Sequence, residues 1–273
     1  GICRNQSANL SASGATSYTW TGGLASTSNP STGALTTTTT YTVTGTMSGC
    51  TNTAVSTVTV TPLPIVTVNS PSICNGQSAN LIASGATSYT WTNGLASTAN
   101  PTTLALTTTT IYTVTGTTNG CTNTAVSTVT VTPLPTVTVN SPSICINQSA
   151  NLIASGATSY TWTNGLASTA NPTTPALTTT TTYTVTGTTS GCTGTAVSTV
   201  TVASSLNITV NSPTICRGQS ANLIASGATG YTWTNGLAST ANPSTGPLTT
   251  TTTYTVTGTT SGCTGTAVST VTV

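Results

Sequence analysis

Cysteine is the residue with the most chemistry in this sequence, because its thiol can form disulfides, bind zinc or act as a nucleophile. The eight cysteines form two sets that each step by 71 residues: Cys3, Cys74, Cys145 and Cys216, and Cys50, Cys121, Cys192 and Cys263. The sets are offset by 47 residues and contain no Cys-x-x-Cys pair, which zinc sites typically use. We therefore expect disulfides, and with them an oxidising, extracellular location.

The spacing leaves two ways to pair these cysteines. We expect each disulfide to close one repeat, as Cys3–Cys50, Cys74–Cys121, Cys145–Cys192 and Cys216–Cys263. Closing such a loop would stabilise a repeat by about 4 kcal/mol through the entropy of the unfolded chain. The alternative links neighbouring repeats, as Cys50–Cys74, Cys121–Cys145 and Cys192–Cys216. Connectivity is not encoded in spacing, so both stay open.

Charged side chains are almost absent, and this excludes most other chemistry. The chain has no Asp, Glu or His, and its charged side chains are Arg4 and Arg217. General acid–base catalysis, an activated serine and calcium binding all need groups that are missing. Two arginines do not make a basic surface for nucleic acid. We expect no enzymatic activity, no cofactor, no metal, no nucleic-acid partner and, without a long apolar run, no membrane insertion.

The 71-residue period also divides the chain into repeats. We place the four repeats at 1–60, 61–131, 132–202 and 203–273, and the first lacks the eleven residues that correspond to Thr61–Pro71. The chain begins with glycine and shows no signal peptide. We expect a processed protein or a segment of a longer array.

Within a repeat, the pattern of residues predicts strands. In the second repeat we expect strands at 65–68, 78–84, 88–92, 112–117 and 125–131, with both cysteines in turns. Alternation places Tyr112, Val114 and Gly116 on one face and threonines on the other. No segment has useful helical periodicity. The fold class we predict is all-β: a tandem array of four small β-sandwiches.

Recurring motifs in these repeats resemble a known architecture. They are Cys-x-(Gly/Asn)-Gln-Ser-Ala-Asn-Leu, Ala-Ser-Gly-Ala-Thr-Ser-Tyr-Thr-Trp-Thr and Thr-Tyr-Thr-Val-Thr-Gly-Thr. The whole chain resembles tandem Ig-like or PKD-like repeats of secreted bacterial surface adhesins and filaments of the Bacteroidota type. Trp91-Thr92-Asn93-Gly94 replaces the Gly-Asp-Gly turn usual in PKD repeats, and the acidic residues that bind calcium in related arrays are missing. The resemblance implies an architecture and no particular ligand.

The surface of such an array would be rich in threonine and poor in charge. Charged residues that normally protect edge strands are missing, so the edges need either strand pairing between chains or a coat of O-glycans. The candidate glycosylation sites are Thr36, Thr37, Thr38, Thr107, Thr108, Thr178, Thr179, Thr249 and Thr250. Asn-x-Ser/Thr sequons occur at Asn5, Asn9, Asn147 and Asn207, and they do not recur in every repeat.

Three functions fit these observations. The leading one is a structural protein, the shaft of an extracellular filament or an adhesin stalk, with copies of itself and covalent glycans as partners. Its first repeat lacks the strand equivalent to Ile65–Val68, and if residues 1–273 are the whole subunit we expect a neighbouring chain to supply one. The alternatives are an adhesin module that binds glycan or protein, for which Tyr89 and Trp91 would have to leave the core, and a threonine-array ice-binding protein.

Overall fold

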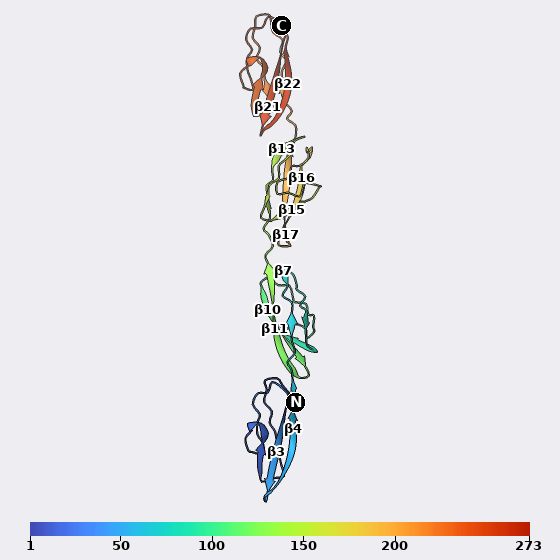
Figure 1. Ribbon diagram of the computed structural model, residues 1–273. Coiled ribbons are helices and arrows are strands. Elements are labelled where there is room, and N and C mark those ends of the chain that lie inside the picture. Colours follow the sequence, from blue (N-terminus) through green and yellow to red (C-terminus); the bar gives the residue numbers. More distant parts are fainter. The chain divides into compact units, whose positions relative to one another are not determined.

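The structure is a computed structural model that describes residues 1–273 (Figure 1). It divides into two compact units, Gly1–Pro133 and Leu134–Val273, and each unit contains two repeats. The same order of strands recurs from repeat to repeat. The prediction of an all-β chain built from four small sandwiches with a 71-residue period is therefore confirmed.

The second repeat shows the complete pattern. Its strands are β6 (Thr67–Val68), β7 (Ser72–Cys74), β8 (Ala83–Ser84), β9 (Ser88–Trp91), β10 (Thr110–Thr118) and β11 (Cys121–Thr132). One sheet has the order β7-β11-β10-β9, and the other pairs β6 with β8. Bridges Gln77↔Leu106 and Asn80↔Thr102 widen the second sheet. Two sheets that enclose one core in this order form an Ig-like sandwich.

The other repeats reuse this plan. The third contains β12 (Thr138–Val139), β13 (Ser143–Cys145), β14 (Ala154–Ser155), β15 (Ser159–Trp162), β16 (Thr181–Thr189) and β17 (Cys192–Ala203). The fourth contains β18 (Thr209–Val210), β19 (Ala225–Ser226), β20 (Gly230–Trp233), the 3₁₀ turn η2 (Thr234–Gly236), β21 (Thr252–Thr260) and β22 (Cys263–Val271). The first contains β1 (Ile2–Cys3), β2 (Ser17–Trp20), η1 (Thr21–Gly23), β3 (Thr39–Met47), β4 (Cys50–Val58) and β5 (Val60–Thr61).

The long hairpin of each repeat follows from alternation in its sequence. Along β10, Tyr112, Val114 and Gly116 are buried, while the threonines between them are only partly covered, as predicted. A Cβ added to Gly116 would lie 2.6 Å from both Ala86 Cβ and Val66 Cγ2. This position therefore admits only glycine while Val66 is in place.

A tight turn joins the two strands of the hairpin. Asn119 and Gly120 have φ values of 50° and 77°, as a type I′ turn requires. The turn leaves Cys121 paired with Thr118, as the first residue of β11. The prediction that the second cysteine lies in a turn is therefore wrong by one residue, because the two-residue turn closes before it.

A short parallel strand was missed in the sequence. Residues Ser72–Cys74 form β7, which pairs in parallel with the end of β11, and Cys74 lies opposite Thr132. We predicted a turn at Cys74, but the turn begins only after it, where Gln77 N donates to Cys74 O at 3.0 Å. The strand expected at 78–84 is reduced to Ala83–Ser84, with two isolated bridges before it.

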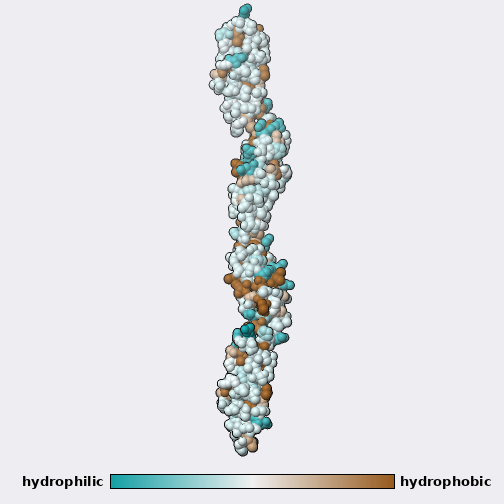
Figure 2. All heavy atoms as spheres, in the orientation of Figure 1, coloured by the Kyte–Doolittle hydropathy of each residue, from teal (hydrophilic) through white to brown (hydrophobic).

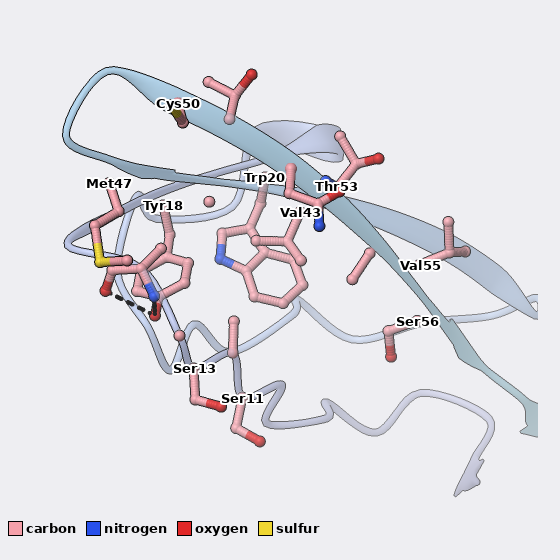
Figure 3. A pocket seen from close by; sticks show the side chains of 17 residues that line it. Ser11, Ser13, Tyr18, Trp20, Val43, Met47, Cys50, Thr53, Val55 and Ser56 are labelled. Atoms are coloured by element: carbon pink, nitrogen blue, oxygen red, sulfur yellow. Dashed lines mark hydrogen bonds between the residues drawn. The ribbon is translucent and has the colours of Figure 1, made fainter.

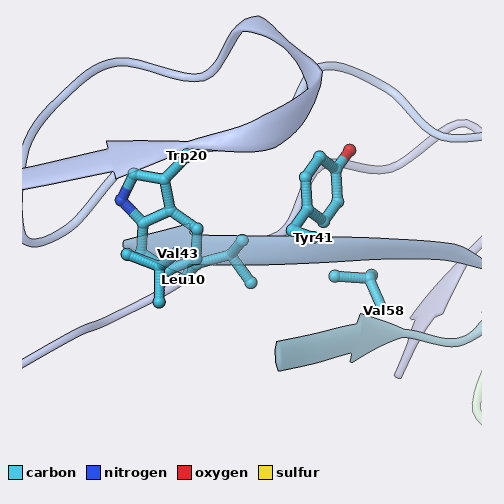
Figure 4. Close-up of a cluster of buried hydrophobic side chains, with 5 residues drawn as sticks. All are labelled: Leu10, Trp20, Tyr41, Val43 and Val58. Atoms are coloured by element: carbon cyan, nitrogen blue, oxygen red, sulfur yellow. The ribbon is translucent and has the colours of Figure 1, made fainter. Parts of the chain in front are cut away.

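Each complete repeat has two small apolar clusters. In the second repeat one contains Val66, Tyr89 and Val114, and the other contains Leu81 and Tyr112. The first repeat has one cluster, formed by Leu10, Trp20, Tyr41, Val43 and Val58 (Figure 4). Its other cluster is missing because the residue equivalent to Val66 is missing. The visible surface is mostly of intermediate hydropathy, as expected for a coat of threonine, serine and glycine (Figure 2).

Candidate functional site

Disulfides join neighbouring repeats at their joints. In the first unit Cys3 of the first repeat bonds Cys121 of the second, with a Cα–Cα distance of 5.6 Å. In the second unit Cys145 of the third repeat bonds Cys263 of the fourth, at 5.5 Å. Both bonds have a sequence separation of 118, the sum of one period of 71 and the offset of 47. In both, a first-set cysteine bonds the second-set cysteine of the following repeat.

The predicted pairing within repeats, Cys3–Cys50 and its equivalents, is therefore wrong. The reason lies in strand β11, which begins at Cys121 and ends at Thr132, opposite Cys74. Eleven residues of extended chain separate the two cysteines of that repeat by about 36 Å, whereas a disulfide needs Cα atoms within about 7 Å. The two cysteines thus lie at opposite ends of the sandwich.

The alternative pairing, Cys50 with Cys74, is also wrong. Cys50 and Cys216 are both free and exposed in this chain. Cys74 and Cys192 are disulfide-bonded. The eight predicted disulfide cysteines thus divide into six that are bonded and two, one in the first repeat and one in the fourth, that are not.

The first strand of a complete repeat is held by hydrogen bonds as well as by apolar packing. In the second repeat Ser127 Oγ donates to Asn69 O at 2.7 Å, and Asn123 Nδ2 donates to Pro64 O at 3.0 Å. Thr67 pairs with Ser84 across the sheet, and their hydroxyl oxygens are 2.7 Å apart. This strand therefore completes both the sheet and the core.

The first repeat has a groove where this strand would lie. The groove has a volume of about 520 Å³ and is lined by residues that include Ser13, Tyr18, Val43 and Cys50. Figure 3 shows Tyr18, Trp20 and Val43 between the strand that carries Cys50 and the segment that carries Ser11 and Ser13. The residues that would hold a first strand are present: Ser13, Asn52 and Ser56 are equivalent to Ser84, Asn123 and Ser127.

Burial confirms that this part of the first repeat is uncovered. Tyr89, Gly116 and Ser127 are buried in the second repeat, whereas their equivalents Tyr18, Gly45 and Ser56 are only half-buried. Ala83 is buried and its equivalent, Ala12, is half-buried. The uncovered side chains are those that a first strand covers in the second repeat.

The candidate glycosylation sites lie on the surface. All nine threonines, and Asn5, Asn147 and Asn207 with them, are exposed. The threonines precede β3, β10, β16 and β21 and lie outside the strands, eight of them in bends. Thr38 differs from the other eight because its hydroxyl accepts a hydrogen bond from Val60 N at 3.0 Å. The prediction of glycans at these positions stays a prediction.

The aromatic side chains serve the fold. Tyr89 is buried, and its hydroxyl donates to Ala86 O and accepts from Ala86 N, both at 2.9 Å. Trp91 Nε1 donates to Thr98 O at 2.9 Å. Burial raises the pKa of Tyr183, a core tyrosine of β16 that is equivalent to Tyr112. Polar tips fixed by the backbone and rings packed in a core are typical of structural aromatics.

Two further observations concern metals and membranes. No group of three or more His, Cys, Asp or Glu side chains lies close enough together to hold a metal ion. No helix in the structure is long and apolar enough to cross a membrane.

Comparisons with known proteins return other tandem Ig arrays. No protein-family model matches the chain, and no curated protein matches it in sequence. Among solved structures, Sidekick-1 immunoglobulin domains 1–5 cover 99% of this chain and 78% of their own length at 16% identity, with a TM-score of 0.31. The I-band fragment I67–I69 of titin covers 77% of this chain and 97% of its own at 11% identity, with a TM-score of 0.37. The N-terminal eight Ig domains of Down Syndrome Cell Adhesion Molecule cover 99% of this chain, and the match takes in 47% of their own length, at 11% identity and a TM-score of 0.35. The assignment of Ig-like repeats rests on the strand order within each repeat.

Proposed function

We propose that this chain is a structural protein of the extracellular space, the shaft of a filament or of an adhesin stalk. One observation carries the proposal: the disulfides cross the joints between repeats, as Cys3–Cys121 and Cys145–Cys263. Domains that act singly as binding modules gain most from a disulfide inside the domain. A bond across the joint instead holds two neighbours together, which serves an array that must transmit force along its length.

The joint disulfide changes how tension passes through the chain. The peptide link from Thr61 to Pro64 and the Cys3–Cys121 bond both connect the first repeat to the second. Pulling on the two ends therefore cannot extend the 118-residue segment between these cysteines until the disulfide breaks. The chain-entropy model gives each such bond about 5 kcal/mol of stabilisation.

The surface suits a structural role in an oxidising space. Two charged side chains among 273 residues leave no group for acid–base catalysis and no basic patch for nucleic acid. We propose that the chain is not an enzyme and needs no cofactor. We also propose that O-glycans on the exposed threonine bends supply hydration that charge would otherwise supply, as part of a surface array of the bacterial kind that the motifs resemble.

We propose that copies of the chain assemble by strand addition in the groove of the first repeat. The occupant has the chemistry of Ile65–Asn69: alternating valines that point inward, followed by an asparagine. Support comes from the second repeat, where this sequence buries Val66 and pairs Thr67 and Val68 with the neighbouring strand. Main-chain pairing with alternate side chains in pockets is a common mode of peptide recognition.

Single-molecule stretching tests the mechanical part. We expect the oxidised chain to resist full extension, and reduction to release roughly 400 Å for each segment of 118 residues between bonded cysteines. The matched control is the Cys3→Ser/Cys121→Ser variant, which should extend further than the unmodified chain without reductant and less far than the fully reduced chain, because Cys74 stays bonded. An oxidised chain that extends as far as the reduced one would contradict the proposal. Antibodies to the chain should label filaments along their length, whereas label confined to filament ends would indicate an adhesin tip.

A peptide tests strand addition. A synthetic peptide with the sequence of residues 61–71 should bind the chain and slow hydrogen exchange around Ser11, Ser13 and Asn52. Exchange in β8 should not change, because the second repeat already holds its own first strand. The control peptide replaces Val66 and Val68 by aspartate. Equal protection by both peptides, or by neither, would rule out a strand-shaped site.

A further inference from the structure

We propose that Cys216 and Cys50 are the two halves of one more joint disulfide, formed between this chain and a neighbouring repeat of the same kind. Cys216 would bond a second-set cysteine, and Cys50 would bond a first-set cysteine. Between two copies of this chain the bond is Cys216–Cys50. The inference deepens the proposed function and rests on it, because it assumes that the array continues end to end.

The turn that follows Cys216 has the same hydrogen bonds as the turns after its bonded equivalents, although Cys216 lies outside a strand whereas Cys3 and Cys145 end β1 and β13. Gln219 N donates to Cys216 O at 3.0 Å, as Gln6 N does to Cys3 O, at the same distance. Gly218 N donates to Leu248 O at 2.7 Å, matching the bond from Asn147 N to Leu177 O beside the bonded Cys145. Cys216 therefore sits on a turn that two bonded cysteines share.

The half at Cys50 is also preformed. Cys50 pairs with Met47 across a two-residue turn, as Cys121 pairs with Thr118 and Cys263 with Thr260. The turn residues Ser48 and Gly49 have φ values of 52° and 83°, close to the 49° and 82° of Ser261 and Gly262. The thiol therefore stands at the tip of the same hairpin as the bonded cysteines.

Burial marks the missing neighbour at both halves. Cys121 and Cys263 are 2% and 7% exposed, because each is bonded to a repeat that lies against its hairpin tip. Cys50, at the equivalent hairpin tip, is exposed to solvent. Cys3 and Cys145 are half-buried, whereas Cys216 is exposed. At Cys50 the hairpin backbone is the same as at Cys121 and Cys263, so the greater exposure there follows the absence of a bonded neighbour. Cys216 also lacks the strand pairing that Cys3 makes with Thr61 and Cys145 with Ala203.

The groove of the first repeat points to the same neighbour. Cys50 lines this groove together with Tyr18 and Val43. At the bonded joint of the first unit, Cys3 lies opposite Thr61, from which the chain passes on to fill the equivalent groove of the second repeat. One neighbouring repeat thus delivers both the strand and the cysteine. A neighbour that fills the groove of the first repeat brings its first-set cysteine to Cys50.

The bond forms by thiol–disulfide exchange with a low-molecular-weight disulfide such as oxidised glutathione. The Cys216 thiolate attacks one sulfur of glutathione disulfide, giving a mixed disulfide and one glutathione thiolate. The Cys50 thiolate of the neighbour then attacks the Cys216 sulfur and expels the second glutathione thiolate. Two protein thiols lose two protons and two electrons in total, and one glutathione disulfide is reduced to two glutathione molecules.

Two complementary variants test the pairing on the full chain. Cys50→Ser retains only the Cys216 half, and Cys216→Ser retains only the Cys50 half, while the bonded cysteines are untouched in both. In a glutathione redox buffer each variant alone should stay monomeric on a non-reducing gel. Their mixture should give a dimer that reductant dissolves, and the unmodified chain should give a ladder of multiples. Peptide mass spectrometry should find Cys216 joined to Cys50.

The opposite results would overturn the proposal. One such result is a single variant that forms as much dimer alone as the two variants form when mixed. The other is that the thiols of Cys50 and Cys216 both end as mixed disulfides with glutathione and form no protein–protein bond. Neither result would contradict the proposed mechanical function, because stretching tests that function through the Cys3–Cys121 and Cys145–Cys263 bonds.

Appending the sequence of residues 132–140 after Val273 should raise the dimer yield at least ten-fold by supplying the strand. An unchanged yield would contradict strand addition and leave the disulfide standing.

Native material distinguishes the two sources of the neighbour. A Cys216 peptide joined to the Cys50 peptide of this sequence identifies a second copy, or an identical repeat in a longer polypeptide. Intact mass under reduction then separates these, because a second copy leaves as a single chain. Free thiols at both positions in native material would overturn the proposal.

Discussion

A buried serine ties the first strand of a complete repeat to the long hairpin. Ser127, Ser198 and Ser269 are wholly buried, and each donates a 2.7 Å hydrogen bond to the carbonyl of Asn69, Asn140 or Asn211. Their equivalent in the first repeat, Ser56, is half-buried and lines the groove, and its hydroxyl has no carbonyl of a first strand to bind. The same serine thus has a hydrogen-bond partner in the second, third and fourth repeats and faces an open groove in the first repeat.

Replacing this serine should affect the second repeat and spare the first. Ser127→Ala removes the donor and leaves the carbonyl of Asn69 buried without a partner, which costs about 1–3 kcal/mol. Hydrogen exchange of the backbone around Thr67 and Val68 should become about ten-fold faster or more. Ser56→Ala is the matched control and should leave exchange in the first repeat unchanged. Equal effects of the two changes would mean that the hydroxyl contributes nothing through Asn69.

At the scale of elements, the sequence could predict the strands whose faces alternate over several residues. Alternation predicts that Tyr112, Val114 and Gly116 share one face, and the structure buries all three. This is a local signal, and it needs no knowledge of which strands meet.

The disulfide pairing could not be predicted because it depends on which strands meet. The short strand β7 has too few residues for a periodic signal, and its partner lies at the far end of the repeat in sequence. Because β7 pairs in parallel with the end of β11, Cys74 lies beside Thr132, where the chain leaves the repeat. Cys121 lies at the hairpin turn, at the opposite end of β11. Without that geometry, pairing the two cysteines of one repeat is the simplest expectation, and the structure contradicts it.

Joints with and without proline should respond differently to loss of their disulfide. The first joint contains Pro62-Leu63-Pro64, whereas the third has Ala203-Ser204-Ser205-Leu206, whose residues border a cavity of about 650 Å³ beside Cys145–Cys263. Proline restricts the backbone, so a proline-free joint depends more on its disulfide. We expect Cys145→Ser/Cys263→Ser to broaden the small-angle scattering distance distribution of the unit 134–273 markedly. The matched change Cys3→Ser/Cys121→Ser should broaden that of the unit 1–133 less, and the reverse order would contradict this account.

For the whole molecule, the near absence of charge removes the usual electrostatic control of stability. Acid unfolding of most proteins comes from paired carboxylates that must take up protons, or from buried histidines that must become charged. This chain has neither residue type. Its exposed surface consists mainly of hydroxyl, amide and apolar groups, none of which titrates near neutrality.

The free energy of unfolding should consequently be constant from about pH 4 to pH 7, because no side chain changes its bound protons between the folded and unfolded states there. Above about pH 10 it should fall. Burial raises the pKa of Tyr183, so the unfolded chain loses that proton first, and stability that is complete below the unfolded pKa is lost as pH rises through the folded one. Denaturant unfolding at several pH values measures this, with Ser127→Asp as a positive control, since a buried carboxyl of raised pKa should make stability fall as pH rises. A change of more than about 1 kcal/mol in the unmodified chain between pH 4 and pH 7 would show that a group outside its side chains governs its stability.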